Sequence, residues 1–491
     1  MAKPLSILYV TSELYPFVKI GGIADISYSL PLALKDEGYD IRVMLPKYGN
    51  VSERKNRIHE INRLRDIEIP LGKGMELATV KSSSVANPRT RVQAYITTNQ
   101  NLFDQKKGIY TNPKTNEDYP DNDLRFIFFN RTVIETCLTL NWAPDIIHCN
   151  DWQSGMIPGY VKTLFKDHFK NTKVIYTIHN SSNQGEFSLK GFTATGLDND
   201  TKKNYTHKKK FNFLKGGLFY ADHINTVSPT HAQELLQDKK FTNGLSDLLV
   251  KRKDQFSGIL NGIDKWSWNP ATDSNIAAKY EDDFVEFKKT NKKALLKKYQ
   301  LAYKEDVPLI GMISRLDEIK GIQLLIDTFD ELMAEEVTVV ILGDGKSELK
   351  TKLKDIAKKY SKKLAIKFIY DEKMAHLIEA GSDFFLIPSI YEPCGLNAMY
   401  SLKYGSIPIV RKTGGLIDNV KEYSPKTKKG NGFVFTEANP KDLVGAVKKA
   451  VELYKNYSEL EKLAISNMDG DYSWDDRVEE YGKIYHSLIE D

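Results

Sequence analysis

The sequence contains few cysteines, no long apolar run and almost no excess charge. Its 491 residues include only Cys137, Cys149 and Cys394, an odd number whose spacing fits neither a disulfide framework nor a metal site. We interpret them as reduced core or loop thiols. No stretch approaches the ~20 apolar residues that a membrane-spanning helix needs. The net charge of +5 is small for this length and argues against a protein that coats nucleic acid.

The N-terminal residues do not have the pattern of a targeting signal. Leu5–Val10 is a short apolar run followed at once by polar residues, which indicates a first strand. We therefore expect a cytoplasmic protein that has no membrane or nucleic-acid partner. The hydrophobic content of 41% and charged content of 27% are those of a globular protein, and the length predicts two or three domains.

Short β-branched runs alternate with amphipathic helical patterns along most of the chain. The predicted strands of the first half are Ser6–Val10, Asp40–Leu45, Arg91–Ile96, Asp145–Cys149, Lys173–Ile178 and His223–Val227. Those of the second half are Pro308–Ile313, Val337–Leu342, Leu364–Ile369, Phe384–Ile387, Ile407–Val410 and Gly432–Phe435. This alternation predicts an α/β protein with parallel sheets. Two such sets predict two Rossmann-like domains facing a deep cleft, with ligands at the carboxyl ends of the strands.

The boundary between the two sets is predicted near residues 255–275, where Gly, Asn and Pro are frequent and periodicity is lost. We expect an N-terminal domain over residues 1–258, a C-terminal domain over 259–470 and a final segment over 471–491. Two lysine-rich stretches are interpreted as solvated helix faces; they are Tyr280–Tyr299, with Lys292, Lys293, Lys297 and Lys298, and Lys346–Lys373.

Two polar regions of the first half are expected to decorate its sheet. The loop between Asn50 and Arg91 is polar and is predicted to carry small extra strands. Residues 98–123 are long and rich in turn residues, which indicates a surface insertion near the cleft.

The most informative segment is Pro388 to Gly415, with the sequence PSIYEPCGLNAMYSLKYGSIPIVRKTGG. It places Glu392 in a loop before a helical run, and the glycine turn Thr413-Gly414-Gly415 after a strand. Both features fall at strand ends of one sheet. This arrangement suits a sugar nucleotide, because a carboxylate accepts hydrogen bonds from sugar hydroxyls and backbone N–H groups bind phosphate.

A second glycine turn follows the first strand, in the loop that ends Lys19-Ile20-Gly21-Gly22. Paired glycines let backbone approach a ligand, and the following helix offers N–H groups to an anion. Lys19 adds a point charge. Taken alone, the pattern is more often that of a tight turn without a ligand.

Polar and aromatic residues follow two further strands of the first half. His148, Asp151 and Trp152 follow one strand, and His179 and Asn180 follow the next. Directional acceptors beside a flat apolar face are typical of carbohydrate sites. For either histidine taken alone, structural hydrogen bonding is the favoured interpretation.

Two cations and a tyrosine follow strands of the second half. Arg315 and Lys320 flank a strand-to-helix loop and would stabilise a departing diphosphate without a metal. A solvated Arg/Lys pair is the alternative. Tyr370 is predicted to end a strand, where it would stack on a nucleobase or lie half-buried as an ordinary tyrosine. Neither a Walker loop nor a His/Cys metal cluster occurs, so we expect no cofactor and no metal.

Seven motifs, in order over nearly the full chain, resemble the bacterial glycogen synthase and plant starch synthase family. They are KIGGIAD, HCNDW, IHNSSNQGEF, ILNGID, SRLDEIKG, EPCGLNAMYSLKYG and RKTGG. SWDDRVEEY near the C-terminus resembles the family's closing helix, which crosses back to the first domain. The resemblance implies a GT-B fold, with the acceptor on the N-terminal domain and the nucleotide sugar on the C-terminal domain. It also implies retaining transfer of glucose from ADP-glucose to the non-reducing end of an α-1,4-glucan.

The resemblance also implies roles for individual residues. On the donor side, Lys19 and Gly22 would contact the phosphate and the sugar. Arg315 and Lys320 would hold the diphosphate, with help from the backbone of Thr413–Gly415. Tyr370 would stack on the base. His179 would bind the 6-hydroxyl and Glu392 the 3- and 4-hydroxyls. Asp151, Trp152 and Asn180 would lie on the acceptor side, with Asp151 near the reaction centre.

The sequence departs from the family pattern at a few positions, and two other functions stay open. Asn150 and Gln153 stand where bacterial members often have histidine, and Ser181–Asn183 stand where more apolar residues are usual. One alternative is a related GT-B transferase that uses UDP-glucose or another acceptor. The other is a non-catalytic glucan-binding protein.

Overall fold

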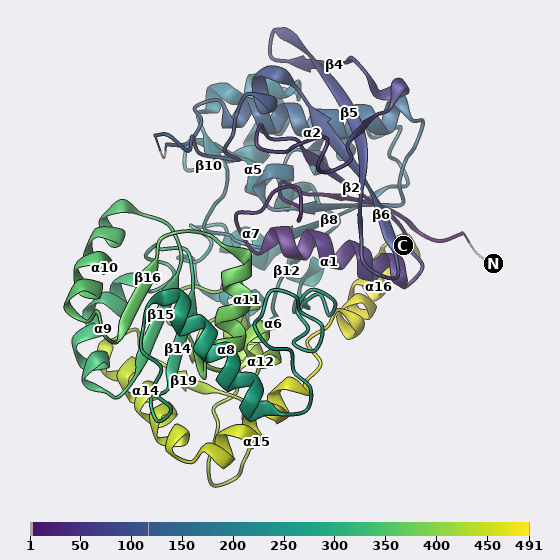
Figure 1. Ribbon diagram of the computed structural model, residues 1–491. Helices are drawn as coiled ribbons and strands as arrows, with labels where there is room; N and C mark the ends of the chain where they lie inside the picture. Colours follow the sequence, from purple (N-terminus) through teal and green to yellow (C-terminus); the bar gives the residue numbers. More distant parts are fainter. Residues whose placement is uncertain (1–2, 116, 491) are drawn as a thin grey trace. The chain divides into compact units, whose positions relative to one another are not determined.

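The chain forms two compact units, each an α/β structure of its own (Figure 1). The computed structural model describes residues 3–115 and 117–490. Unit 1 contains the residues up to Gly262 and those from Trp474 onward, and unit 2 is Ile263–Ser473. The observed boundaries lie a few residues after the predicted ones. In the described residues, no helix is long and apolar enough to cross a membrane.

Unit 1 is built on a ten-stranded sheet with the order β13-β12-β8-β7-β1-β2-β6-β5-β3, and β4 pairs with β5. Its strands are β1 (Ser6–Val10), β2 (Asp40–Pro46), β3 (His59–Glu60), β4 (Ile67–Leu71), β5 (Gly74–Ala86), β6 (Arg91–Thr98), β7 (Ile146–Asn150), β8 (Lys173–Ile178), β12 (His223–Thr226) and β13 (Phe256–Gly258). From β13 to β6 all neighbours are parallel, whereas β5 is antiparallel to its neighbours. Instead of small extra strands alone, the polar region after residue 50 contributes β5, a strand of 13 residues.

The helices of unit 1 connect these strands. They are α1 (Ile23–Asp36), α2 (Asn122–Thr139), α3 (Ile157–Lys162), α4 (Asn199–Lys202), α5 (Phe213–Tyr220), α6 (Pro229–Gln237), α7 (Ser246–Lys251) and α16 (Asp475–Glu490), beside a small sheet of β9 (Glu186–Phe187), β10 (Thr206–His207) and β11 (Lys210–Asn212). Strands β1 and β7 are buried over their whole length, as expected where helices cover both faces of a parallel sheet. The predicted strands of both units match observed ones to within two residues at each end.

The C-terminal helix α16 belongs to unit 1, as the predicted closing helix should. Tyr485 Oη lies 2.8 Å from His148 Nδ1, and His148 Nε2 lies 2.6 Å from Thr177 Oγ1. Thr177 donates to Asn225 Oδ1, so His148 Nε2 donates to Thr177 and Nδ1 accepts from Tyr485. Asn225 Nδ2 in turn donates to Tyr481 Oη at 3.1 Å. His148 is therefore a buried anchor for α16 and not a ligand-binding residue.

We expect Tyr485→Phe to lower the free energy of unfolding by about 1–3 kcal/mol, the cost of leaving a buried acceptor without a hydrogen-bond donor. The reason is that His148 Nδ1 loses its donor while the tyrosine ring and its packing stay. Urea denaturation measures the change. Tyr472→Phe is the matched control, because Tyr472 is half-buried and its hydroxyl donates to the backbone carbonyl of Asn467, which also accepts from the amide of Gly470. An equal loss in both variants would contradict the anchoring role.

Unit 2 contains a six-stranded parallel sheet with the order β16-β15-β14-β17-β18-β19. Its strands are β14 (Leu309–Ile313), β15 (Thr338–Leu342), β16 (Leu364–Lys367), β17 (Phe384–Ile387), β18 (Ile407–Arg411) and β19 (Phe433–Phe435). Its helices are α8 (Phe284–Tyr299), α9 (Ile322–Ala334), α10 (Ser347–Lys359), α11 (Glu372–Gly381), α12 (Leu396–Lys403), α13 (Gly415–Asn419), α14 (Pro440–Lys455) and α15 (Tyr457–Met468). Numbered within the unit, the order is 3-2-1-4-5-6, which is that of the Rossmann fold.

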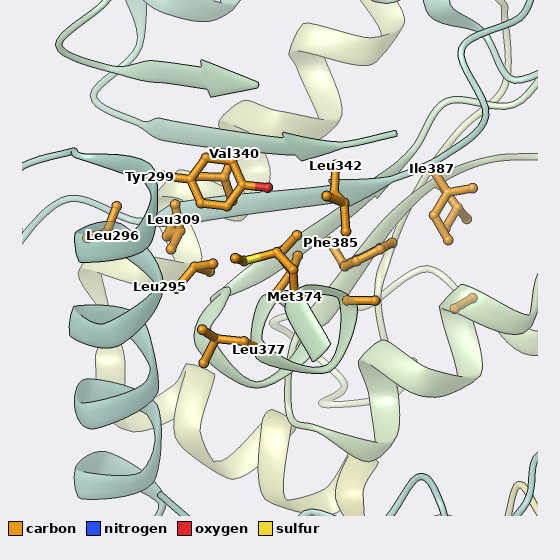
Figure 2. Close-up of a cluster of buried hydrophobic side chains, with 14 of the residues drawn as sticks. Leu295, Leu296, Tyr299, Leu309, Val340, Leu342, Met374, Leu377, Phe385 and Ile387 are labelled. Atoms are coloured by element: carbon orange, nitrogen blue, oxygen red, sulfur yellow. The ribbon is translucent and has the colours of Figure 1, made fainter. Parts of the chain in front are cut away.

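A buried apolar cluster holds α8 and α11 against this sheet (Figure 2). Helix α8 contributes Leu295, Leu296 and Tyr299. They meet side chains of α11 and of three adjacent strands: Leu309, Val340, Leu342, Met374, Leu377, Phe385 and Ile387. The cluster fixes the strands whose carboxyl ends carry the candidate site.

The prediction that the lysines of α8 are all solvated is wrong for Lys288, which is buried and bonds the Tyr404 carbonyl and Ser406 Oγ, and for Lys292. The side chain of Lys292 is buried, and Nζ donates to Asp383 Oδ2 at 2.7 Å, to the carbonyl of Val307 and to Tyr454 Oη. The helical period places Lys292 on the same inner face as Leu295 and Tyr299, so it enters the core and is paired there. Lys293, Lys297 and Lys298 are exposed, as predicted.

Candidate active site

In unit 2, the candidate residues follow strands β14 and β17, the two neighbours at which the strand order reverses. Ligands of open α/β sheets bind outside the carboxyl ends of strands at such a reversal. The loop after β14 carries Arg315 and Lys320, and the loop after β17 carries Glu392. The strand order brings the two loops together although they are far apart in the sequence.

Lys320 and Glu392 form a close ion pair. Lys320 Nζ lies 2.8 Å from Oε1 and 2.7 Å from Oε2 of Glu392, and Ser389 Oγ donates to Oε2 at 2.8 Å. The lysine side chain is 20% exposed and that of the glutamate 13%. A cation and a carboxylate are thus held side by side, and both are largely buried but still reach solvent.

Backbone contacts hold in place the two loops that carry Lys320 and Glu392. The amides of Ile390 and Tyr391 donate to the carbonyl of Ile319. Gly321 has φ +73°, and a Cβ there would lie 2.0 Å from the carbonyl oxygen of Pro388, so only glycine fits. Lys320 precedes this glycine, so the close approach fixes the backbone from which its side chain extends to Glu392.

The glycine turn after β18 packs against the Glu392 loop. The amide of Gly415 donates to the carbonyl of Glu392 at 3.0 Å and to that of Pro393 at 3.1 Å. A Cβ at Gly415 would lie 2.3 Å from the carbonyl oxygen of Cys394. The structure thus brings Thr413–Gly415 next to Glu392, but the amide of Gly415 is already bonded within the protein.

Arg315 and Tyr370 lie on the exposed rim of unit 2. The Arg315 side chain is 50% exposed, and its guanidinium lies 3.3 Å from Asp317 Oδ2. Tyr370 is 50% exposed, and its hydroxyl bonds the carboxylate of Glu372. The prediction that Tyr370 ends its strand is wrong. Strand β16 stops at Lys367, whose partner Leu342 is the last residue of β15, so the chain leaves the sheet before Tyr370.

In unit 1, the sheet reverses between β1 and β7, and the loop after β1 carries Lys19 and Gly22. Gly22 is the N-cap of α1, and Lys19 Nζ lies 2.8 Å from Asp25 Oδ1. The buried carboxylate of Glu13 accepts hydrogen bonds from the amides of Ile20 and Gly21 at 2.7 and 3.0 Å. These two amides, which precede α1, are therefore bonded to a carboxylate of the chain itself.

Asp151 is held in a strained conformation between β7 and the following turn. Its φ is +53°, which is uncommon for a residue with a side chain. Its Oδ1 accepts from the amides of His179 at 2.7 Å and Asn180 at 3.2 Å. Burial raises the pKa of Asp151 to about 7. The structure thus joins three predicted residues, and the carboxyl titrates in the neutral range.

The side chain of His179 is buried and neutral. Its exposure is 9%, and burial lowers its pKa to about 3. Nε2 lies 2.8 Å from Asn150 Oδ1. Nδ1 is buried and has no hydrogen-bond partner among the described residues. Buried polar atoms normally have a hydrogen-bond partner, and a polar ligand group can supply one here.

Trp152 does not offer the flat open face that was predicted for it. It is 4% exposed, and its ring lies 4.9–6.1 Å from four other aromatic rings, those of Tyr110, Phe126, Phe187 and Phe213. Gly185 closes the ring further, since a Cβ there would lie 2.3 Å from it. These partners are distant in sequence, so the residues beside Trp152 gave no sign that its ring is enclosed.

Two polar residues of the site were missed. Tyr110 comes from the region predicted to be a surface insertion, and its hydroxyl bonds Ser12, Glu13 and Gln153. Ser389 supports Glu392 and could have been noticed, because it lies three residues earlier in the same loop. No pattern near Tyr110 indicates its inward position.

The described residues also bear on the expected thiols and metals. All three cysteines are buried free thiols. Within residues 3–115 and 117–490, no group of three or more His, Cys, Asp or Glu side chains is arranged to hold a metal ion.

Comparison with known proteins gives matches over the whole chain. Residues 6–251 match the family described as starch synthase catalytic domain, and residues 295–466 match glycosyl transferases group 1. The glycogen synthase of Pseudothermotoga lettingae is 39% identical over 99% of each chain. That of Chlorobaculum parvum is 33% identical over 98% of each chain.

Solved structures match as well. The catalytic domain of starch synthase IV from Arabidopsis thaliana, bound to ADP and acarbose, superposes with a TM-score of 0.91 at 29% identity over all of both chains. A sucrose-phosphate synthase from Thermosynechococcus elongatus has a TM-score of 0.61 at 15% identity over 99% of each chain, a likeness of fold alone.

Proposed function

The chain belongs to the glycogen and starch synthase family of GT-B glycosyltransferases, and we propose that it transfers glucose from ADP-glucose to the non-reducing end of an α-1,4-glucan with retention of configuration. The observation that carries this proposal within the structure is the Lys320–Glu392 pair at the reversal point of the unit 2 sheet. The complex of starch synthase IV with ADP and acarbose, a relative at 29% identity, supports the choice of donor and acceptor.

In this proposal unit 2 binds the nucleotide sugar. Lys320 and Arg315 hold the diphosphate, aided by the backbone of Thr413–Gly415. Glu392 accepts hydrogen bonds from the 3- and 4-hydroxyls, and Tyr370 stacks on the base. The position of Lys320 beside Glu392 supports this division, because a glucosyl diphosphate presents an anion next to a ring of hydroxyl donors. No metal takes part in the proposal.

Unit 1 contributes the remaining contacts. Lys19 and Gly22 meet the donor phosphate and sugar, and His179 accepts from the 6-hydroxyl through its buried Nδ1. Asp151 and Asn180 serve the acceptor side. Trp152 keeps only a supporting role in the proposal, because its ring is enclosed by other aromatic rings.

Charge explains how these residues promote the transfer. The bond from the anomeric carbon to the diphosphate oxygen breaks, and a bond to the acceptor oxygen forms on the same face. The acceptor hydroxyl gives its proton to the departing diphosphate, so no carboxylate nucleophile is needed, in contrast to retaining hydrolases. Cations that stabilise the charge developing on the leaving group lower the barrier, typically by ~3 kcal/mol for each well-placed group.

Transfer to maltoheptaose tests the proposal. The enzyme is given ADP-glucose with the anomeric carbon labelled with ¹³C, and the extended chains are analysed by NMR and by digestion with an α-1,4-specific exo-enzyme. We expect α-configured, digestible additions at a rate that excess chelator leaves unchanged. A β-linked product would refute retention, and loss of activity with chelator would refute a metal-independent reaction.

The raised pKa of Asp151 predicts a pH dependence. If the reaction needs the carboxylate, kcat/KM rises with pH about a midpoint near 7, because burial keeps the group protonated below that value. Asp151→Asn should give a lower and flatter profile. A wild-type profile of kcat/KM without this midpoint would refute the role.

The same raised pKa affects stability. Between the ordinary Asp pKa near 4 and pH 7, the folded state binds more protons than the unfolded state. The free energy of unfolding contributed by this group therefore falls as pH rises through that window.

A further inference from the structure

We propose that Asn150 is a positioning residue that fixes the proton of His179 on Nε2 and so leaves Nδ1 as a hydrogen-bond acceptor for a substrate hydroxyl. The part that concerns substrate rests on the proposed function. The part that concerns the proton on the ring stands on the geometry of unit 1 alone.

Asn150 is the last residue of β7 and is fully buried. Its Oδ1 lies 2.8 Å from His179 Nε2 and accepts from Tyr9 Oη at 3.0 Å. Its Nδ2 donates to the backbone carbonyl of Val10 at 2.9 Å and approaches that of His148 at 3.4 Å. The amide thus bridges β1, β7 and the start of the loop after β8.

These contacts determine which way the amide group points. A backbone carbonyl can only accept, so the NH₂ group must face Val10. The opposite orientation would set two carbonyl oxygens against each other and leave the NH₂ group facing His179 and Tyr9. Oδ1 therefore faces His179, and because Oδ1 can only accept, Nε2 must donate.

A neutral imidazole carries one proton, and burial keeps His179 neutral at physiological pH by lowering its pKa to about 3. With the proton on Nε2, Nδ1 holds a lone pair. That atom is buried, and it has no partner in the part of the chain that the structure describes. A buried acceptor without a donor is costly, so a ligand hydroxyl that donates to Nδ1 is favoured over a group that can only accept.

The site therefore distinguishes ligands by their ability to donate a hydrogen bond to Nδ1 of His179. A glucosyl donor has a 6-hydroxyl that can give its proton to Nδ1. A 6-deoxy analogue has no polar group there, and a 6-fluoro analogue has an atom that cannot donate. If Nδ1 is an acceptor, the fluoro analogue should be no better than the deoxy analogue. If Nδ1 carried a proton, the fluorine would recover part of the loss.

The first experiment examines the ring itself in the enzyme without substrate. Nitrogen-15 NMR of histidine-labelled protein distinguishes a protonated from an unprotonated ring nitrogen, and the His179→Gln variant identifies the signals of His179. We expect Nε2 protonated and Nδ1 unprotonated from pH 6 to 8. A proton on Nδ1 would overturn the inference, whatever the enzyme transfers.

The second experiment measures kcat/KM for glucosyl, 6-deoxy and 6-fluoro donors. In the wild type we expect the glucosyl donor to be preferred about 10-fold over both analogues, the scale of one buried hydrogen bond. Asn150→Leu should reduce this preference to near 1. Asn225→Leu is the matched control and should keep the preference. Asn225 is equally buried, but it lies on β12, which is separated from β7 by β8, and it bonds Thr177 and Tyr481.

Asn150→Asp guards against a variant that fails to fold. It keeps an acceptor opposite Nε2, so the NMR signature should survive wherever the protein folds. Equal loss of preference in Asn150→Leu and Asn225→Leu would overturn the positioning role. If the wild type transferred no glucose at all, the proposed function would fail, while the NMR result on the ring proton would still decide the inference.

Discussion

Lys320→Ala is expected to lower kcat by about 100-fold or more while the protein stays folded. The lysine is ion-paired with Glu392, and the close approach of Gly321 to Pro388 fixes the backbone next to it. Removing it takes away a charge that would stabilise the departing diphosphate. It also leaves the Glu392 carboxylate, 13% exposed, without its counter-ion and facing an anionic donor.

Steady-state rates with saturating donor measure the effect. Lys346→Ala is the matched control, because Lys346 is also ion-paired, with Glu318 of the same loop, but is 60% exposed; its rate should stay near that of the wild type. Lys320→Arg keeps the charge and should retain more activity than Lys320→Ala. A near-normal rate for Lys320→Ala would show that the diphosphate is held elsewhere.

Glu392→Ala is expected to reduce kcat by a similar factor, about 100-fold, for a different reason. Its carboxylate is held by Lys320 and Ser389, so both oxygens have fixed directions and can accept from sugar hydroxyls at low entropic cost. Without it, Lys320 loses the partner that holds its side chain in place.

Glu392→Gln separates the two contributions. It keeps the shape and one acceptor oxygen but removes the charge, so its rate should lie between those of the wild type and Glu392→Ala. Because the two residues are in contact, the double variant Lys320→Ala/Glu392→Ala should lose much less than the product of the single losses. Strictly multiplicative losses would contradict a shared function. Glu318→Ala, which removes the partner of Lys346, serves as control.

The fold could be predicted because hydrophobic patterns are local. Strands such as Ser6–Val10 and Lys173–Ile178 are short apolar runs between loops, and their observed bounds equal the predicted ones. Edge strands were harder. Strand β13 has only three residues, all half-buried, and its pairing with β12 supplies a stability that its own sequence does not indicate.

The site could be predicted only in its parts. The sequence placed Lys320 and Glu392 at strand ends, but their ion pair depends on β14 and β17 being neighbours. The enclosure of Trp152 depends on rings up to 61 residues away, such as Phe213. The burial of Lys292 follows from the helical period, which a count of charges along the chain does not use.

The central claim is tested most directly by the choice of donor. Glycogen is incubated with the enzyme and with radiolabelled ADP-glucose or UDP-glucose in parallel, and kcat/KM is compared for incorporation into the polymer. The account predicts strong incorporation from ADP-glucose and little from UDP-glucose. A preference for UDP-glucose would contradict the proposed donor, and incorporation from neither would contradict glucosyl transfer to an α-glucan.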